Sequence, residues 1–411
     1  MTSRAVEGKP GLLVLASTYP RWKDDPEPGF IHELCKRLGA DFDVTALVPD
    51  APGADPDGEL EGVHVVRYRY APRRLQTLVN DGGINANLRR ARWKWLLVPG
   101  FVLAQYLRAR RLLATGRFSA VHAHWLLPQG LVAWAIARRK GTPYVVTSHG
   151  GDLFGLRGAM LAALKRLVAA GSTGMSVVSS AMRDEAARLG LRPPHIAVVP
   201  MGVDFETRFV ADPGATRERD RLIFVGRLVA KKGVRHLLDA LPLVLARRPA
   251  ATLDIIGFGP EEPALRAQVE RLGLGGHVRF LGAMPQHELP ARFARASAFV
   301  APFVRDPSGD QEGLPVALME AVGCGCPAIA GSVPGLQDLL GEHHAEVCVD
   351  PTDLQALADR IVAVLEDPEA AAARAAAIRR TAVERLDWSR IGAAYSELIQ
   401  ASIARRAGRH G

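Results

Sequence analysis

The sequence predicts an α/β protein made of two doubly wound domains, each with a parallel sheet and helices on both faces. Three observations support this fold class. Short apolar runs alternate with helical patterns, which favours a parallel sheet wrapped by helices. The alternation stops after Pro200 and starts again at Leu222, with a polar stretch between them. The chain has 411 residues, more than one hydrophobic core usually organises, so two domains are expected.

Apolar runs in the first half mark seven expected strands, at residues 12–16, 44–48, 63–68, 120–123, 144–147, 175–178 and 196–199. Six further runs give the second half its own sheet, at residues 222–225, 252–256, 278–281, 298–301, 328–329 and 347–349. We therefore predict a first domain over residues 1–203, a second over residues 204–386 and a final helical segment over residues 387–411. Ligands of open α/β sheets bind at the carboxyl ends of the strands, so two such domains facing one another form a deep cleft.

The composition argues against several classes of protein. Charged residues make up 23% of the chain, which is typical of a globular rather than a disordered protein. The four cysteines form no C-x-x-C pair and no histidine stands at zinc-finger spacing, so we expect neither a disulfide framework nor a metal site. Residues 12–16 are too short for the core of a signal peptide and are better explained as the first buried strand. We therefore expect a cytoplasmic protein.

The net charge of +9 raises the question of an anionic partner. The basic residues are mostly arginines dispersed along helices rather than interleaved with aromatic side chains, so nucleic acid is not expected. An anionic membrane is the better candidate. The stretch from Arg89 to Arg111 has an apolar core bracketed by Arg and Lys, with two tryptophans at one edge. Its core, residues 96–107, is too short to span a bilayer, but such a helix can lie at the inner face of the cell membrane. An alternative interpretation of the same stretch, which is at least as well supported, is an amphipathic helix that covers the N-terminal sheet.

Two carboxylates eight positions apart mark a candidate site in the second domain. Glu312 stands just ahead of a Gly-Leu-Pro helix start, and Glu320 lies inside the apolar helix that follows. Pro315 suits the first helical turn, so the N–H groups of Gly313 and Leu314 should lie near a helix end that attracts anions. An acid in a buried helix is costly unless it receives hydrogen bonds, which ribose hydroxyls could supply. The alternative is that Glu320 pairs with a nearby arginine.

Loops at the strand ends of the second domain add positive charge and tight turns. Gly226 would let the backbone approach a phosphate, while Arg227 and Lys232 would supply the charge that a leaving diphosphate needs. Gly257 and Gly259 follow the next strand, where they are equally explained as formers of tight turns. They are not a dinucleotide fingerprint, because an acid stands where its third glycine would be.

Histidines end two neighbouring strands of the first domain. His149 is followed by two glycines and Asp152, a position from which a ligand could be touched, although an ordinary loop histidine is the alternative. His122 and His124 project the same way, being two residues apart in a strand. They could form a metal site, but no third ligand at suitable spacing is visible, so a structural or acceptor-side role is preferred.

Together these motifs resemble glycosyltransferase family 4. The resemblance rests on the E-x7-E spacing within DQEGLPVALMEA, the run GRLVAKKG, the G-x-G-P turn at Gly257 and the H-G-x-D pattern at His149. It spans nearly the whole chain and is densest over residues 226–336. It implies the GT-B fold, two Rossmann-like domains that face a central cleft, with a nucleotide-sugar donor on the second and an acceptor on the first. It also implies that the helix of residues 387–411 crosses back onto the first domain.

The resemblance also implies roles for individual residues. The transfer would depend on Glu312, His149, Arg227 and Lys232. The donor would contact Glu320, Gly226, Gly257, Gly259, Met284, Gly313, Leu314 and Gly29. Asp152 and His124 would lie on the acceptor side. The sequence departs from the family at Pro28-Gly29, where many relatives carry a glycine pair, and this puts the phosphate contact of Gly29 in doubt.

The activity implied is transfer of a hexose from a UDP- or GDP-sugar, with retention of the anomeric configuration. The acceptor would be a hydroxyl of a glycan, a lipid-linked sugar or a small molecule, in surface polysaccharide or glycoconjugate biosynthesis. Electrostatic stabilisation of the leaving diphosphate would be the main catalytic effect, and we expect no cofactor and no divalent metal.

Three other functions remain to be weighed. A glycoside hydrolase would use Glu312 and Glu320 as its paired carboxylates, but it would leave Arg227 and Lys232 without a purpose. A nucleotide-sugar epimerase of the same fold would not release nucleoside diphosphate in response to an acceptor. A membrane-surface binding protein without catalysis would not explain the motifs of the second domain.

Overall fold

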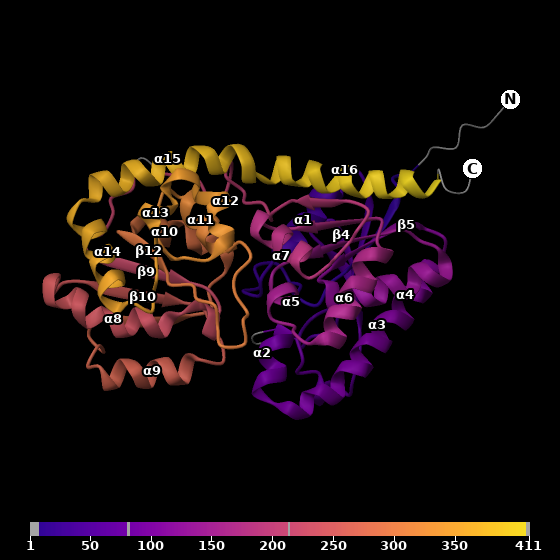
Figure 1. Ribbon diagram of the computed structural model, residues 1–411, viewed down its shortest axis with the longest axis horizontal. Coiled ribbons are helices and arrows are strands. Elements are labelled where there is room, and N and C mark those ends of the chain that lie inside the picture. Colours follow the sequence, from indigo (N-terminus) through magenta and orange to yellow (C-terminus); the bar gives the residue numbers. More distant parts are fainter. Residues whose placement is uncertain (1–7, 80–82, 213, 408–411) are drawn as a thin grey trace.

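The computed structural model describes residues 8–79, 83–212 and 214–407. Two lobes lie side by side, each with its own sheet, and the last two helices run along one edge of both (Figure 1). Both sheets are parallel over nearly their whole width and are covered by helices. The predicted α/β class with two doubly wound domains is confirmed.

The first sheet has the strand order β3-β4-β2-β1-β5-β6-β7-β8. Its strands are β1 (Gly11–Leu15), β2 (Asp43–Pro49), β3 (Asp57–Leu60), β4 (Val63–Tyr68), β5 (Phe118–His124), β6 (Tyr144–Ser148), β7 (Gly174–Val177) and β8 (Ile196–Val198). Neighbouring strands are parallel except β3, which pairs antiparallel with β4 at the edge. We did not predict β3, because its sequence DGEL is polar and an exposed edge strand needs no apolar pattern.

The helical elements of the first lobe are α1 (Phe30–Leu38), η1 (Arg73–Leu75), α2 (Gly83–Arg90), η2 (Arg92–Leu96), α3 (Leu97–Leu113), η3 (Leu126–Gly130), α4 (Leu131–Lys140), α5 (Gly151–Phe154), α6 (Ala159–Gly171) and α7 (Ser180–Arg188). The sequence predicts a single basic helix over residues 89–111, which is wrong in detail. The chain is extended at Ala91, so that α2 ends before η2 and α3 begin.

The second sheet has the order β11-β10-β9-β12-β13-β14 and is parallel throughout. Its strands are β9 (Arg221–Val225), β10 (Thr252–Ile256), β11 (Val278–Gly282), β12 (Ala298–Ala301), β13 (Ala328–Gly331) and β14 (Cys348–Val349). We expected the last strand to begin at Val347, but that residue ends a short helix.

The helical elements of the second lobe are η4 (Ala230–Lys232), α8 (Val234–Arg247), α9 (Glu262–Arg271), η5 (Gln286–Glu288), α10 (Leu289–Arg295), α11 (Val316–Gly323), η6 (Pro334–Leu336), α12 (Gln337–Leu340), η7 (Gly341–His343), α13 (His344–Val347), α14 (Leu354–Glu366) and α15 (Pro368–Leu386). Within the described ranges, no helix combines the length and the hydropathy needed to cross a bilayer.

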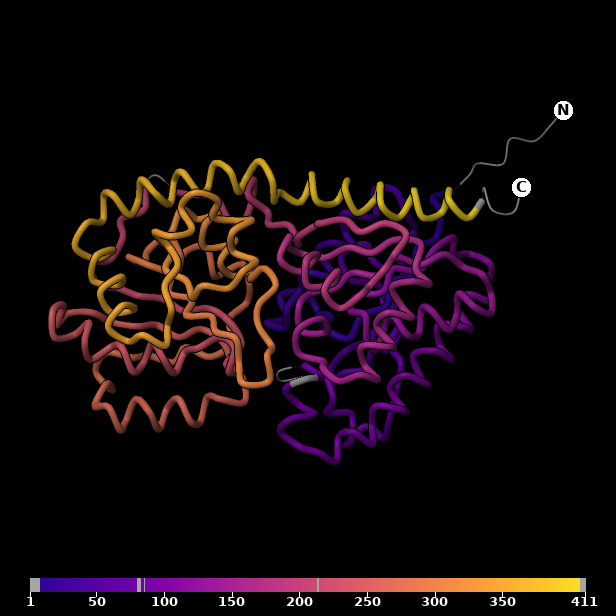
Figure 2. The backbone as a smooth tube through the Cα atoms, viewed as in Figure 1, coloured from indigo at the N-terminus to yellow at the C-terminus, as the bar shows by residue number. Residues whose placement is uncertain are grey.

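The last helix, α16 (Trp388–Ala407), packs on the first lobe although it follows the second in sequence (Figure 2). It begins where Val203 and Asp387 form a parallel bridge, so the two passages of the chain between the lobes lie side by side. The fully buried Tyr395 donates a hydrogen bond from its hydroxyl to the carbonyl of Val199, at 2.9 Å. Helix α16 also contacts α1 and the strands β5, β6 and β7. The core of the first lobe therefore includes side chains of α16.

Candidate functional site

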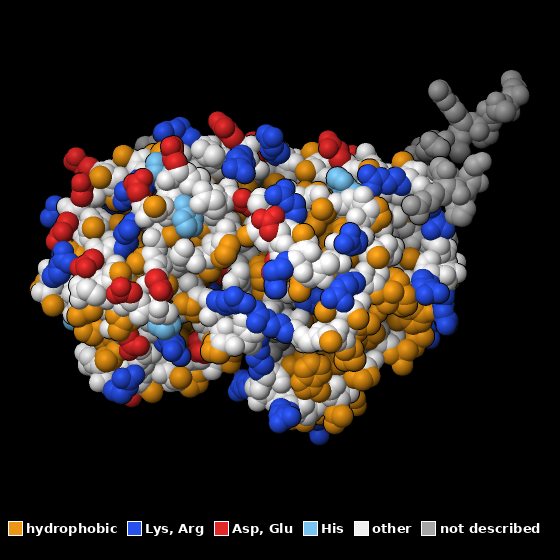
Figure 3. Space-filling view, viewed as in Figure 1, with side chains coloured by type: hydrophobic (Ala, Val, Ile, Leu, Met, Phe, Trp, Pro, Cys, Tyr) orange, Lys and Arg blue, Asp and Glu red, His pale blue; other side chains and the backbone are white. Residues whose placement is uncertain are grey.

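Two adjoining cavities lie between the lobes, where the carboxyl ends of both sheets face one another. The larger has a volume of about 670 Å³ and the smaller about 260 Å³. They share Phe30 and Val316 as well as the backbone at Gly226 and the side chain of Arg227. The space-filling view has a notch between the two halves of the molecule at this level (Figure 3). This is the place that a doubly wound architecture provides for a ligand.

Glu312 lies at the wall of the larger cavity, in the loop between β12 and α11. Its carboxylate forms ion pairs with Lys231 at 3.3 Å and with Lys232 at 3.4 Å, both at the end of η4. Burial opposes ionisation of Glu312, but the two lysines outweigh it and hold the pKa at about 2. Lys231 also pairs with Asp310 at 3.4 Å. The carboxylate is thus ionised and fixed at neutral pH.

Lys232 and Gly226 lie together at the end of β9. The Lys232 ammonium lies 4.9 Å from the ring centroid of Phe303 and forms a cation–π contact with it. Gly257 has a φ of +138°, and a Cβ there would overlap the carbonyl of Gly226. Only glycine allows these two loops to approach so closely. Gly259 does not line either cavity, because it packs against the backbone of Leu228.

Arg227 extends from the same loop toward the first lobe. A methyl group placed on Gly83, at the start of α2, would lie 3.0 Å from Nη1 of Arg227. The lobes are also joined close by, where Arg89 of α2 pairs with Asp306 at 2.7 Å. The cleft therefore holds a cationic group at the boundary between the two cavities.

Glu320 lines the smaller cavity from α11. Gln286 of η5 donates to its carboxylate at 2.5 Å, and Arg208 in turn donates to the amide oxygen of Gln286 at 2.7 Å. Burial raises the pKa of Glu320 to about 7, against the opposing effect of the Gln286 hydrogen bond. Glu320 therefore bonds to the amide of Gln286, and Arg208 is linked to it only through that amide.

Met284 and Gly29 lie in the smaller cavity with Glu320, as does Gly257. Gly29 precedes the first turn of α1, and nothing within 4 Å would obstruct a Cβ at this position. The described protein atoms would therefore leave room for a larger side chain at residue 29. The smaller cavity thus gathers residues of both lobes around one buried carboxyl group.

The structure modifies the predicted start of the helix after Glu312. Pro315 has an extended backbone and precedes α11, which begins at Val316, so Pro315 is not in the first turn. Leu314 lines the larger cavity. Gly313 does not, because it packs against the first lobe near the carbonyl of His149. The same close approach explains Gly150, whose φ is +106°.

Three histidines lie in contact with one another at the ends of β5 and β6. Nδ1 of His124 and Nε2 of His149 are 2.9 Å apart and hydrogen-bonded, and the rings are stacked with centroids 5.1 Å apart. His122 lies beside His124, with the ring centroids 4.3 Å apart and the ring planes tilted by 39°, and it bonds to Thr147 at 2.7 Å. Burial, followed by the neighbouring His122, lowers the pKa of His149 to about 3. His149 reaches the larger cavity as a neutral group, and His124 lies behind it, outside the cavity.

Asp152 also borders the larger cavity, but both of its oxygens are engaged. One accepts from the N–H of Leu126 at 2.6 Å and the other from the hydroxyl of Ser148 at 2.8 Å. Burial raises the pKa of this carboxyl group. Asp152 therefore ties the loops after β5 and β6 together.

Sequence reasoning missed Lys231, Gln286 and Arg208. The KKG run contains the signal for Lys231, although the motif singles out only the second lysine. Gln286 and Arg208 meet Glu320 only through the fold, since they are 34 and 112 positions away in the sequence. Within the described ranges, no group of three His, Cys, Asp or Glu side chains is placed to hold a metal ion.

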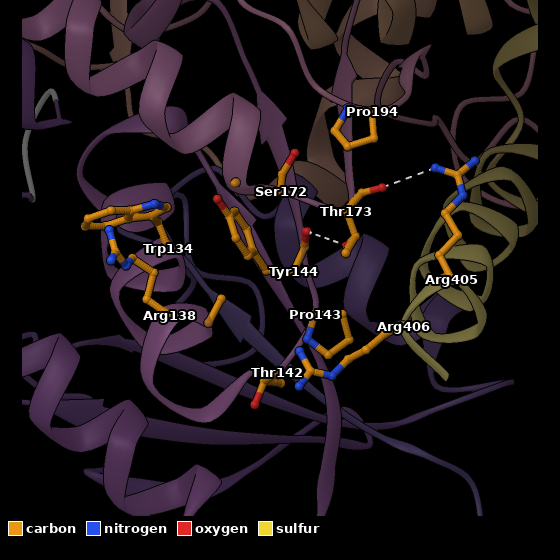
Figure 4. Close-up of a pocket in the computed structure, with 12 residues that line it drawn as sticks. Trp134, Arg138, Thr142, Pro143, Tyr144, Ser172, Thr173, Pro194, Arg405 and Arg406 are labelled. Carbon is orange, nitrogen blue, oxygen red and sulfur yellow. Dashed lines mark hydrogen bonds between the residues drawn. The ribbon is translucent and has the colours of Figure 1, made fainter. Parts of the chain in front are cut away.

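A third cavity of about 420 Å³ lies at the opposite end of β6, near the end of α16 (Figure 4). Arg405 donates to the carbonyl of Thr173 at 3.2 Å, and the hydroxyl of Thr173 donates to the carbonyl of Tyr144 at 2.8 Å. Arg138 stacks on Trp134 at 5.3 Å. None of the predicted site residues lines this cavity.

Comparisons with known proteins agree with this geometry. A glycosyl transferases group 1 domain matches residues 206–381, and a glycosyl transferase 4-like domain matches residues 30–202. A GDP-mannose-dependent alpha-(1-6)-phosphatidylinositol monomannoside mannosyltransferase from Mycolicibacterium smegmatis is 32% identical over 74% of this chain and 81% of its own length. A glycogen synthase from Mycobacterium tuberculosis is 29% identical over 95% of this chain and 94% of that protein.

Solved structures support the fold. A sucrose-phosphate synthase from Thermosynechococcus elongatus superposes with a TM-score of 0.78 at 19% identity, covering 97% of this chain and 100% of the other. The Anabaena protein HepE, in complex with UDP and glucose, gives a TM-score of 0.71 at 19% identity, covering 95% and 99%. The predicted GT-B fold is thereby confirmed. The chain belongs to the family 4 glycosyltransferases, and it is a hexosyltransferase.

Proposed function

We propose that this enzyme moves a hexose from a nucleotide sugar to an acceptor hydroxyl with retention of the anomeric configuration. The observation that carries the proposal is the ionised Glu312, held between two lysines at the wall of the larger cavity. A fixed negative charge there can stabilise positive charge that develops at the anomeric carbon. Neither the hydrolase nor the epimerase alternative gains support from the relatives.

The donor is proposed to lie across both cavities. Glu320 would accept hydrogen bonds from ribose hydroxyls in the smaller one, and the diphosphate would pass Gly226 and Arg227 at the junction. Arg227 and Lys232 would neutralise the leaving diphosphate, so we propose that catalysis needs no divalent metal. The relatives named as GDP-mannose-dependent favour GDP-mannose as the first donor to test.

The chemistry proposed is attack on the same face as the departing group. The leaving diphosphate would accept the proton of the acceptor hydroxyl as the new glycosidic bond forms. His149 is neutral and would orient the sugar by hydrogen bonding rather than by charge. The biological setting we propose is the synthesis of a surface polysaccharide or glycoconjugate.

The test begins with thermal melting in the presence of GDP, UDP or ADP. A ligand at about a hundred times its Kd should stabilise the protein by about 2.7 kcal/mol, so the correct base is found by the largest shift. Nucleoside diphosphate release from the matching sugar donor is then measured with and without acceptor, in magnesium and in excess chelator. We expect release that depends on acceptor and is similar in both buffers. Release without any acceptor would contradict transfer, and a tenfold loss in chelator, restored by metal, would contradict the metal-free mechanism.

We also propose that the surface formed by α2, η2 and α3 rests on an anionic membrane. Leu96 is 81% exposed, and Trp93 and Trp95 are each about half exposed. Arg110 and Arg111 are exposed on the same helix as Leu103, whose side chain is 56% accessible. Tryptophan and arginine together suit the headgroup region of a bilayer.

Sedimentation with vesicles tests this surface. Binding to vesicles that contain phosphatidylglycerol should fall steeply with salt, because exposed charges are screened over about 8 Å at physiological ionic strength. The double variant Trp93→Ser/Leu96→Ser should reduce the bound fraction about fivefold or more. Trp22→Ser is the matched control, since Trp22 is 43% exposed but lies elsewhere on the first lobe. Equal binding to neutral vesicles, or an equal effect of the control, would contradict the proposal.

A further inference from the structure

The larger cavity is lined by two kinds of side chain. One part of its lining is polar or charged and includes His149, Arg227, Lys232 and Glu312. Another part of its lining consists of aliphatic and aromatic side chains of α2, η2, α3, the loop before α6 and α6 itself, namely Ile84, Leu88, Trp95, Val98, Leu156 and Leu161. These side chains, apart from the indole N–H, offer no hydrogen bond to a sugar hydroxyl. A ligand gains binding free energy from these side chains only by burying its own apolar surface against them.

The apolar wall continues out of the cavity onto the surface of the molecule. Trp95 lines the cavity and is 51% exposed, and its neighbour Leu96 is 81% exposed. On the opposite side, Leu161 lines the cavity while Met160 is 73% exposed. Figure 3 shows hydrophobic side chains gathered over α3 and α6, with Lys and Arg around them. A contiguous exposed patch of this kind marks a docking surface.

Two arginines in the last turn of α2 line the same cavity as the apolar side chains of that helix. Arg89 and Arg90, at the end of α2, both line the cavity and are both exposed. Arg89 pairs with Asp306, and within the described ranges Arg90 forms no ion pair. A phosphate group beside the end of α2 would meet guanidinium groups, which bind phosphate oxygens well.

We propose that the acceptor is a lipid-linked sugar whose phosphate lies at Arg89 and Arg90 and whose apolar chain lies in the groove between η2–α3 and the start of α6. The groups that line the cavity match the parts of such a molecule: Glu312 faces the sugar, the guanidinium groups of α2 bind the anion, and the apolar side chains cover a hydrocarbon chain that leaves toward the exposed apolar patch. This inference rests on the proposed transfer function and narrows its acceptor to one chemical class.

Soluble alkyl phosphates test the groove whichever sugar the acceptor carries. Binding of butyl phosphate, decyl phosphate and decyl glucoside is measured by calorimetry below their micelle concentrations. Because each buried methylene adds to the transfer free energy, decyl phosphate should bind about tenfold or more tightly than butyl phosphate. Decyl glucoside should bind more weakly than decyl phosphate. Equal affinity for the two phosphates would overturn the groove, and equal affinity for the two decyl compounds would overturn the phosphate position.

Matched variants locate the bound probe. Leu161→Asn, and independently Val98→Asn, should lower the affinity for decyl phosphate about fivefold or more. Neither change should alter the affinity for butyl phosphate. Leu167→Asn is the control, because Leu167 is an exposed leucine of the same helix outside the cavity. Arg90→Gln should weaken both phosphates but not decyl glucoside. An equal effect of the control would show adsorption to the outer surface and overturn the proposal.

Nucleoside diphosphate stabilisation separates this proposal from the function on which it rests. All variants should keep the parent's shift in melting temperature with nucleoside diphosphate, since none of the changed residues lines the smaller cavity. A protein that binds nucleoside diphosphate but discriminates no alkyl chain refutes the lipid groove alone. A protein that binds no nucleoside diphosphate refutes the transferase proposal.

Discussion

Glu312→Gln is expected to lower kcat about 10²-fold or more, as the loss of other positioned electrostatic groups does. The carboxylate is held ionised by Lys231 and Lys232, with a pKa of about 2, so it carries full charge at any pH where the enzyme is assayed. The amide keeps the size of the side chain and removes that charge from the place where positive charge develops. Donor KM should change little, because the interaction is made in the transition state.

Steady-state kinetics at saturating donor and acceptor measure this effect. Glu366→Gln, at an exposed position of the second lobe, is the matched control and should leave kcat unchanged. Glu312→Gln removes the carboxylate that Lys231 and Lys232 share, and this loss could destabilise the fold. Its melting temperature must therefore be shown to equal that of the parent. A change in KM alone would mean that Glu312 binds the donor equally in the ground and transition states. No change in either constant would contradict a glycosyl-transfer role for this residue.

Glu320→Gln is expected to act mainly on the donor, with an increase in donor KM of about 10- to 100-fold. Hydrogen bonds to an ionised group contribute about 1.5–3 kcal/mol each, and the amide replaces them with weaker ones. The pKa of Glu320 is about 7, and the ionised form is the better acceptor for ribose hydroxyls. Donor KM of the parent should therefore fall as pH rises through about 7, and the variant should lose this dependence.

The sign of the pKa shift also predicts the stability of this variant. The folded-state pKa of Glu320 lies above the ordinary value of 4.5, so the stability that the group contributes is present at low pH and is lost as pH rises through about 7. Glu320→Gln should thus melt no lower than the parent at pH 8, where the parent buries an ionised group. If the variant instead abolished turnover at saturating donor, the roles of Glu320 and Glu312 would be reversed.

The strands could be predicted because buried parallel strands are continuous apolar runs, which local sequence displays. Strand β3 and the break at Ala91 could not, since an exposed edge and a single extended residue leave little apolar pattern. The E-x7-E pair was visible because both acids lie in one short segment. Its partners were not visible, because Gln286 and Arg208 reach Glu320 from different elements.

The histidine stack shows the same limit within one domain. His124 and His149 end adjacent strands β5 and β6, and the sequence marks each as a strand-end residue. Their mutual hydrogen bond depends on the register of these strands and on the path of the loop after Ser148. Local pattern thus supplied the candidates, while the pairings required the assembled sheets.

The position of α16 has a consequence for how the protein is made. A nascent chain that has just completed β8 has all the strands of its first sheet but lacks Tyr395 and Ile399, which are fully buried against that lobe in the finished protein. Those side chains are synthesised nearly two hundred residues later, after the whole second lobe. Part of the apolar face of the first sheet therefore stays uncovered until α16 has been synthesised. The second lobe can bury its own core during that delay, so the domain that is translated first is the one that is finished last.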